Sequence, residues 1–110
     1  MEINSKYPEF WQNKGLTLEN LERFSEAISC YDYALKIDPN NVEIWNGKGT
    51  SLTKLGKAEE ALECYDTALQ ISPNFLLALN NKGITLSFLH KYEEALSCHD
   101  TALEIDPKCN

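Results

Sequence analysis

The chain has 110 residues, which is enough for one domain. Its 10 Lys and Arg against 17 Asp and Glu give a formal net charge of −7, which disfavours nucleic acids and anionic membrane surfaces as partners. The 43% hydrophobic and 25% charged residues are typical of a folded globular protein. The sequence has no apolar run long enough to span a bilayer and no signal-peptide core near Met1, so we expect a cytoplasmic protein.

An interval of 34 residues recurs along the whole sequence. It separates Cys30 from Cys64 and Cys64 from Cys98, and such even spacing is typical of a repeat protein. We therefore divide the chain into a lead-in at 1–7 and three repeats at 8–41, 42–75 and 76–109, which form a single domain over 8–109. The same interval separates Lys14, Lys48 and Lys82; Gly15, Gly49 and Gly83; Ala27, Ala61 and Ala95; Asp32, Asp66 and Asp100; and Pro39, Pro73 and Pro107.

Each repeat is predicted to form two antiparallel helices joined by a short turn. We expect helices at 8–21 and 24–37 in the first repeat, at 42–55 and 58–71 in the second, and at 76–89 and 92–105 in the third. The second helix of each repeat stops before an X-Pro step, because proline disfavours the helical conformation in the preceding residue. Gly56 favours the turn within the second repeat, whereas its equivalents Glu22 and His90 specify their turns less well.

Glycine recurs in the middle of each first helix, where it costs about 1 kcal/mol relative to alanine. This repeated cost predicts a close contact between the helices of each repeat that a Cβ atom would block. We expect the facing small residues to be Ala27, Ala61 and Ala95.

The repeated residues resemble the tetratricopeptide repeat family, whose units follow Trp-x2-Leu-Gly-x2-Tyr, then Ala-x3-Phe, Ala and Pro over 34 residues. Lysine replaces the family's leucine in every repeat, and Leu79 and His99 weaken the aromatic pattern of the third repeat, which suggests looser packing there. The matching residues are Trp11, Gly15, Ala27, Tyr31, Ala34 and Pro39; Trp45, Gly49, Ala61, Tyr65, Ala68 and Pro73; and Leu79, Gly83, Ala95, His99, Ala102 and Pro107.

The resemblance implies an all-α fold, a right-handed alpha-alpha superhelix (solenoid) of three helix-turn-helix units whose first helices line a concave groove. Family members usually bind proteins or peptides and rarely catalyse reactions, so the resemblance implies a protein or peptide partner. Two alternatives remain: a fragment of a longer repeat scaffold that serves assembly, and a regulatory arm of a separate catalytic domain. Fold alone does not decide among them.

The groove is predicted on the face of the first helices that turns away from their apolar stripe. Recurring amides could hold the backbone of an extended peptide, as in family members with an asparagine ladder; Asn13 and Asn81 match that ladder, while Gly47 interrupts it. Alternatively, the amides are only solvated. The groove face of the third repeat is apolar at Leu77, Ile84 and Phe88. These side chains could anchor a ligand side chain or, alternatively, pack on a further helix. The candidate groove residues are Gln12, Asn13, Leu16, Asn46, Thr50, Asn80, Asn81, Ile84 and Phe88.

Some family members clamp the acidic tail of a heat-shock chaperone with lysine, arginine and asparagine. The equivalent positions here carry no positive charge, so we do not expect this clamp. They are Gln12, Leu16, Gly47, Leu77 and Asn81.

The sequence offers little support for catalysis. Of its two histidines, His90 is assigned to a solvated turn and His99 to a packing position. Cys98 and His99 point about 100° apart on one helix, which is a poor geometry for a metal site or a nucleophile–base pair. We therefore predict no enzyme, no cofactor and no metal site. Cys30, Cys64 and Cys98 are expected to be buried and too far apart for disulfides, leaving Cys109 to pair only between molecules.

The third repeat has no predicted helix after it to cover its apolar face. Repeat arrays need polar terminal units to avoid exposing such a face. Three explanations of this uncovered face remain: the uncapped repeat associates with another copy, the chain is part of a longer array, or its end frays.

Overall fold

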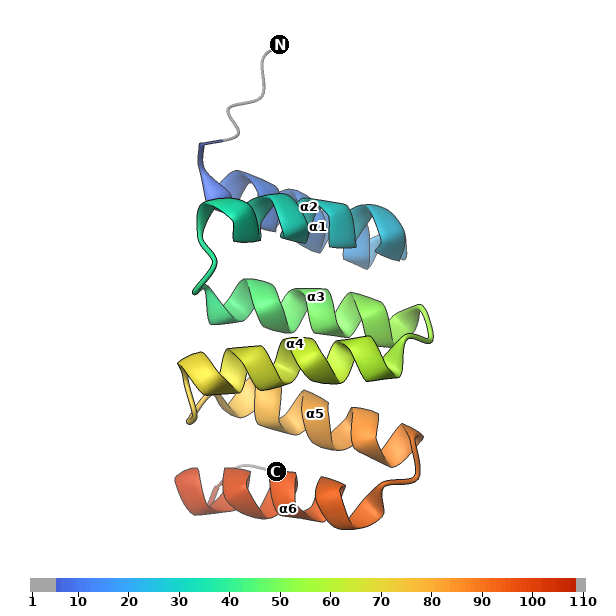
Figure 1. Cartoon of the computed structure of the whole chain (residues 1–110), viewed down its shortest axis with the longest axis vertical. Helices are drawn as coiled ribbons and strands as arrows, with labels where there is room; N and C mark the ends of the chain where they lie inside the picture. The colour runs from blue at the N-terminus through green and yellow to red at the C-terminus, as the bar shows by residue number, and fades with distance from the viewer. Residues whose placement is uncertain (1–5, 109–110) are drawn as a thin grey trace.

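The computed structural model describes residues 6–108 and consists there of six helices (Figure 1). Their ends lie within one residue of the predicted boundaries. The predicted lead-in at 1–7 and the end of the third repeat at 109 fall largely outside the described residues. The helices are α1 Pro8–Asn20, α2 Phe24–Ile37, α3 Val42–Lys54, α4 Ala58–Ile71, α5 Leu76–Phe88 and α6 Tyr92–Ile105.

The helices form three antiparallel pairs that stack along one long axis (Figure 1). The chain measures 49 × 25 × 21 Å, and each pair packs on the next through α2 with α3 and α4 with α5. The first helices α1, α3 and α5 also approach one another, whereas among the described residues the second helices α2, α4 and α6 do not. The first helices therefore line the inner side of the stack, which confirms the predicted all-α solenoid.

The three turns inside the pairs share one conformation. Glu22, Gly56 and His90 have φ angles of 61°, 82° and 63°, the left-handed region that favours glycine. In each turn the next N–H donates to a carbonyl oxygen five residues back, as from Arg23 to Leu18 at 2.8 Å. This bond closes the helix end in the way of a Schellman motif. The turn is thus the same whether or not the sequence supplies glycine.

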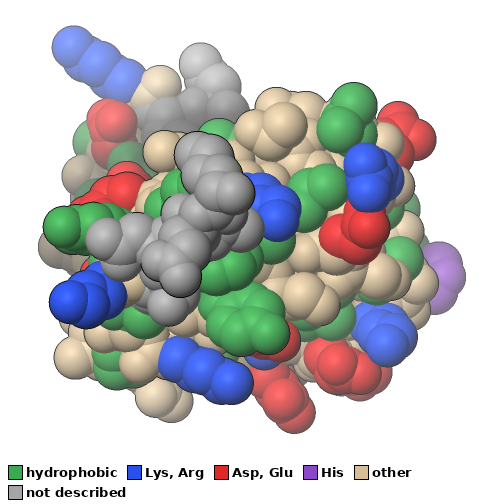
Figure 2. Space-filling model, turned by 90° about the horizontal axis from the view of Figure 1, so that it is seen from above, with side chains coloured by type: hydrophobic (Ala, Val, Ile, Leu, Met, Phe, Trp, Pro, Cys, Tyr) green, Lys and Arg blue, Asp and Glu red, His purple; other side chains and the backbone are tan. Residues whose placement is uncertain are grey.

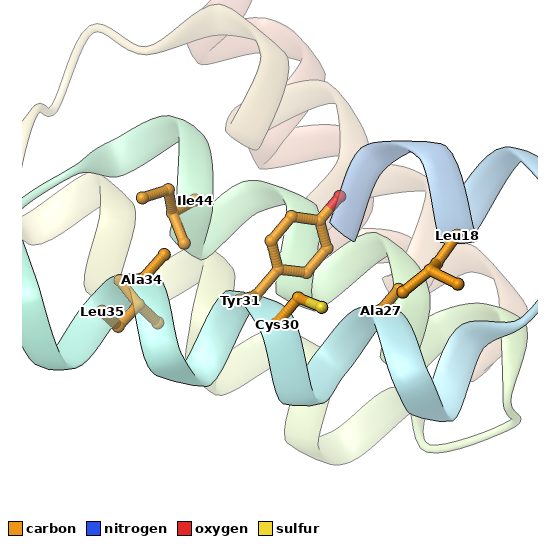
Figure 3. Packing of buried hydrophobic residues seen from close by; sticks show 7 residues of the cluster. All are labelled: Leu18, Ala27, Cys30, Tyr31, Ala34, Leu35 and Ile44. Carbon is orange, nitrogen blue, oxygen red and sulfur yellow. The ribbon is translucent and has the colours of Figure 1, made fainter. Parts of the chain in front are cut away.

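The core follows the repeat. In the first repeat it is built around Tyr31, whose ring projects from α2 with its hydroxyl group pointing away from that helix (Figure 3). The equivalent buried cluster of the second repeat contains Tyr65, and that of the third contains Leu86, Ala95 and Cys98. The labelled residues of Figure 3 are Leu18, Ala27, Cys30, Tyr31, Ala34, Leu35 and Ile44.

The prediction that alanines lie closest to the mid-helix glycines was wrong, because side-chain rings lie closest to them. A Cβ atom on Gly15 would lie 2.8 Å from Cε1 of Tyr31, and one on Gly49 would lie 2.5 Å from Cε1 of Tyr65. At Gly83 the closest atom is Cε1 of the His99 ring, at 2.7 Å. The predicted alanines are buried, but the rings lie nearest to the glycines. Glycine is required because a flat ring needs the space of the side chain.

Ion pairs cross both boundaries between repeats. Lys48 Nζ lies 2.7 Å from Oδ1 of Asp32, and Lys82 Nζ lies 2.7 Å from Oδ1 of Asp66. Two of the three lysines that replace the family's leucine, Lys48 and Lys82, therefore bind the preceding repeat. Viewed along the long axis, acidic and basic side chains are interspersed with hydrophobic ones (Figure 2).

The cysteines at the repeat interval are free and buried, as predicted: Cys30, Cys64 and Cys98. The predicted pairing of Cys109 concerns a residue outside the described part. None of the helices in residues 6–108 has the length and hydropathy of a bilayer-spanning segment.

Candidate functional site

Two adjoining hollows run along the first helices. The first, of about 260 Å³, lies between the first and second repeats and includes Gln12, Leu16, Asn46 and Thr50 in its lining. The second, of about 430 Å³, lies between the second and third repeats; its lining includes Thr50, Asn81, Ile84 and Phe88. Because Thr50 lines both, the two hollows adjoin, and we treat them as one groove. We call it the inner groove.

The structure brings together most of the predicted groove residues and leaves two aside. Asn13 on α1 and Asn80 on α5 are exposed and line neither hollow. Each lies next to a groove residue in the sequence, Gln12 and Asn81, and one residue rotates the side chain by about 100° around a helix. Asn13 is therefore poorly placed to continue an amide row with Asn81.

An amide pair joins the two hollows. Nδ2 of Asn81 on α5 donates a hydrogen bond of 3.0 Å to Oδ1 of Asn46 on α3. Both side chains are half-buried. A side-chain amide carries two N–H donors and an acceptor oxygen, so the pair keeps donors on both residues and the carbonyl oxygen of Asn81 available for a ligand.

The middle repeat has no amide at the position equivalent to Asn81 because the ring of Tyr31 occupies that space. A Cβ atom on Gly47 would lie 2.9 Å from Cζ of Tyr31 and 3.1 Å from its hydroxyl oxygen. Asn46, one residue earlier, is thus the amide of α3 that lines the inner groove.

Tyrosine hydroxyl groups form the polar floor of the groove. The hydroxyl group of Tyr31 donates to Oε1 of Glu19 at 2.8 Å, and Ser51 Oγ donates to the same oxygen at 3.4 Å. Burial, followed by the hydrogen bond to Glu19, raises the pKa of Tyr31 well above its usual value. The hydroxyl group therefore remains a donor at neutral pH and holds the Glu19 carboxylate in place.

One repeat further on, hydroxyl groups replace this carboxylate. Thr53 Oγ1 lies 3.4 Å from the hydroxyl oxygen of Tyr65 and 3.4 Å from Oγ1 of Thr85. From the sequence, Tyr31 and Tyr65 were identified only as matches to the repeat pattern, and it was not predicted that their hydroxyl ends reach the groove. The signal was the recurrence of a polar residue twelve positions before each tyrosine, at Glu19 and Thr53.

Charge and polarity differ between the two hollows. The lining of the first contains Glu19 and Glu43 and no basic residue. The lining of the second contains Lys54 beside Ile84 and Phe88, and the latter two side chains are exposed. The inner groove is thus acidic at one end and apolar with one positive charge at the other.

Within residues 6–108, no group of three or more His, Cys, Asp and Glu residues is arranged to hold a metal ion. Nδ1 of His90 lies 2.6 Å from the hydroxyl oxygen of Tyr92 in an exposed turn, and the His99 ring packs beside Gly83. Burial raises the pKa of Cys98 and that of Cys64, the latter to about 11. These thiols are therefore protonated at neutral pH and are poor nucleophiles.

Several solved structures share this fold. The first TPR of Spaghetti (RPAP3), solved with the HSP90 peptide SRMEEVD, has a TM-score of 0.90 and 23% identity over 99% of this chain and 86% of that one. MamA has a TM-score of 0.90 and 20% identity over 96% of this chain and 61% of its own. The Arabidopsis OM64 TPR domain has a TM-score of 0.88 and 20% identity over 94% and 85% of the two chains.

A comparison with curated protein sequences gives no match. Family models described as tetratricopeptide repeat match residues 8–41 and residues 40–108, which together include all six helices. These matches agree with the 34-residue interval, the three helix pairs and the glycine–ring contacts. The chain belongs to the tetratricopeptide repeat family.

Proposed function

We propose that the chain is a protein-interaction module that binds an extended peptide segment in the inner groove. The observation that carries this proposal is the half-buried pair of Asn46 and Asn81 where the two hollows meet. An extended peptide has unpaired N–H and C=O groups along its backbone. The available donors of the pair and the oxygen of Asn81 can bind one group of each kind whatever the peptide's side chains are.

The groove chemistry favours a ligand without acidic side chains at the first hollow. There Glu19 and Glu43 would repel a carboxylate. The RPAP3 domain was solved with an acidic peptide, SRMEEVD. At the positions of the acidic-tail clamp, this chain has neutral or apolar residues such as Gln12, Leu16 and Leu77. We therefore expect a ligand with an apolar side chain for Ile84 and Phe88 and a neutral or basic one for the first hollow.

The test is to select binders from a library of displayed peptides with random sequence and to measure the affinity of the best binder by fluorescence anisotropy. The double variant Asn46→Ala, Asn81→Ala removes two ligand hydrogen bonds of about 0.5–1.5 kcal/mol each, so the Kd should rise about tenfold. Asn80→Ala is the matched control, because this exposed asparagine of α5 lies outside both hollows and should leave the Kd unchanged.

Selection that yields no peptide would reject the proposed function. An unchanged Kd in the double variant, or an equal loss in Asn80→Ala, would place binding outside the inner groove. The peptide SRMEEVD serves as the acidic probe, and we expect it to bind more weakly than the selected peptide.

End-to-end assembly is a second candidate, favoured by the ion pairs between repeats. Asp32 and Asp66 on the second helices each bind a lysine of the next repeat, Lys48 and Lys82. Asp100 is the equivalent acid on α6 and has no ion pair within residues 6–108. A further unit with lysine at the equivalent position would complete the series.

The apolar contacts between repeats support the same candidate. Leu35 on α2 is 8% exposed because the second repeat covers it, whereas its equivalent Leu103 on α6 is 45% exposed. A second copy could cover Leu103 and bring its own Lys14 to Asp100. Sedimentation velocity at rising concentration should show association that Asp100→Lys weakens. A monomer at every concentration would reject this candidate.

A further inference from the structure

A separate hollow lies on the side of the second helices, between α4, α5 and α6. Its volume is about 430 Å³. Its floor contains Leu62, Leu79, Leu86 and Cys98, and its rim includes Asp66 and Lys82. None of these residues lines the inner groove, so the outer hollow is separate from the proposed peptide site.

The preceding repeat shows which group fills the same position there. The residues 34 positions before the four floor residues are Ile28, Trp45, Leu52 and Cys64. They pack in one hydrophobic cluster, in which the indole of Trp45 lies between the first and second repeats. Its Nε1 donates a hydrogen bond of 2.7 Å to the carbonyl oxygen of Pro39. Leu79 stands in place of Trp45, and leucine is too small to fill the site of an indole.

A positive charge is already in position for an aromatic ring. In the second repeat, Lys48 Nζ lies 5.7 Å from the centroid of the Trp45 ring while it pairs with Asp32 at 2.7 Å. In the third repeat, Lys82 pairs with Asp66 at the same 2.7 Å, and both line the outer hollow. A ring placed in the hollow as Trp45 is placed one repeat earlier would therefore receive the same cation–π contact from Lys82.

The geometry points to the outer hollow as a docking site for a tryptophan side chain of a partner polypeptide. The leucine floor receives the rings, and Lys82 faces them from the rim. Glu94 and Asp66 make the rim acidic around that single lysine, which favours basic residues beside the docked tryptophan. Tryptophan is also one of the side chains enriched among the anchors of protein interfaces.

The experiment uses two short peptides, acetyl-Lys-Trp-Lys-amide and acetyl-Lys-Leu-Lys-amide, titrated into the whole chain and followed by two-dimensional NMR. The tryptophan peptide should cause saturable shifts at Leu79, Leu86 and Cys98, and the leucine peptide should bind at least threefold more weakly. Free indole is the third probe, and weaker binding of indole than of the tryptophan peptide would show that the site takes its ring from a polypeptide.

Leu79→Trp is the decisive variant, because it gives the third repeat the residue that fills this site in the second. It should reduce binding of the tryptophan peptide at least tenfold. Leu96→Trp is the matched control: Leu96 lies on α6, is 57% exposed and does not line the hollow, so its replacement should leave binding unchanged. Circular dichroism checks that both variants fold.

Lys82→Gln keeps the hollow open and removes the cation, so it tests the site even if Leu79→Trp does not fold. The loss of this charge acts equally on the lysines of both peptides, but it removes the cation–π contact from the tryptophan peptide alone, so the preference for the tryptophan peptide over the leucine peptide should fall several-fold. The inference is overturned if wild-type protein shows no saturable shifts at the floor residues, if indole binds as tightly as the tryptophan peptide, or if binding persists in folded Leu79→Trp. None of these results bears on the Asn46–Asn81 site.

Discussion

The left-handed turns predict that glycine at positions 22 and 90 stabilises the chain. Glu22 and His90 have φ angles of 61° and 63° and take the same turn as Gly56, at 82°. A residue with a Cβ atom pays about 1–2 kcal/mol for the left-handed conformation. The variants Glu22→Gly and His90→Gly remove this strain while the hydrogen bonds of the turns, made by the backbone, remain.

The magnitude follows from two opposing contributions. Relief of strain stabilises the folded state by about 1–2 kcal/mol, and the greater freedom of glycine in the unfolded chain costs about 0.4–1 kcal/mol. The net gain is about 0.5–1 kcal/mol for each variant. The two turns belong to the first and third repeats and share no contacts, so the double variant should gain about 1–2 kcal/mol. The contact of His90 with Tyr92 is exposed and subtracts little.

Urea unfolding followed by circular dichroism measures this gain as a shift of the midpoint at constant slope. Gly56→Ala is the matched control in the opposite direction. A Cβ atom at Gly56 meets no atom within 4 Å, so its cost of about 0.5–1 kcal/mol is conformational only. Glycine variants that were neutral or destabilising, with Gly56→Ala destabilising as expected, would refute the prediction. They would show that the left-handed backbone at Glu22 and His90 is not strained.

Two further predictions concern the core. Gly49→Ala places a Cβ atom 2.5 Å from the Tyr65 ring, so it should destabilise the chain by about 1–3 kcal/mol in the same urea assay, more than Gly56→Ala; an equal effect would mean that the ring moves aside freely. Burial raises the pKa of Cys64 to about 11, so its thiolate fraction in the folded chain should increase tenfold per pH unit from pH 7 to 10, and its labelling by iodoacetamide should increase in parallel; a plateau near pH 9 would contradict the burial of this thiol.

The helical architecture could be predicted from the sequence because the 34-residue interval places the same two helices in each repeat. Once Cys30, Cys64 and Cys98 set the period, the X-Pro steps and helical spacing determine where each helix begins and ends. The partners of the mid-helix glycines could not be predicted in this way. Spacing identifies the face of a helix that is buried, but it does not say which side chain of the neighbouring helix reaches across it.

The residues that line the groove could be predicted from the sequence only to within one position along each helix. Gln12 and Asn81 line it, while Asn13 and Asn80 beside them do not, and a step of about 100° separates such neighbours. The position of helix α1 relative to α3 decides which of the two faces inward, and this depends on packing between repeats. The outer hollow had a sequence signal, since Leu79 departs from the tryptophan of the first two repeats.

The differences among the repeats, more than their shared pattern, decide what the chain can bind. Where the pattern is kept, as at Tyr31 and Tyr65, the rings pack on the mid-helix glycines of their own repeats, and the Tyr31 ring also packs on Gly47 of the next repeat. Gly47 stands where the other repeats have asparagine, and the Tyr31 ring that fills its side-chain space presents a ring to a ligand in place of an amide. Leu79 likewise opens a hollow where the shared pattern has an indole. Both departures lie at boundaries between repeats, where an added ligand would contact two units at once and stabilise their stacking.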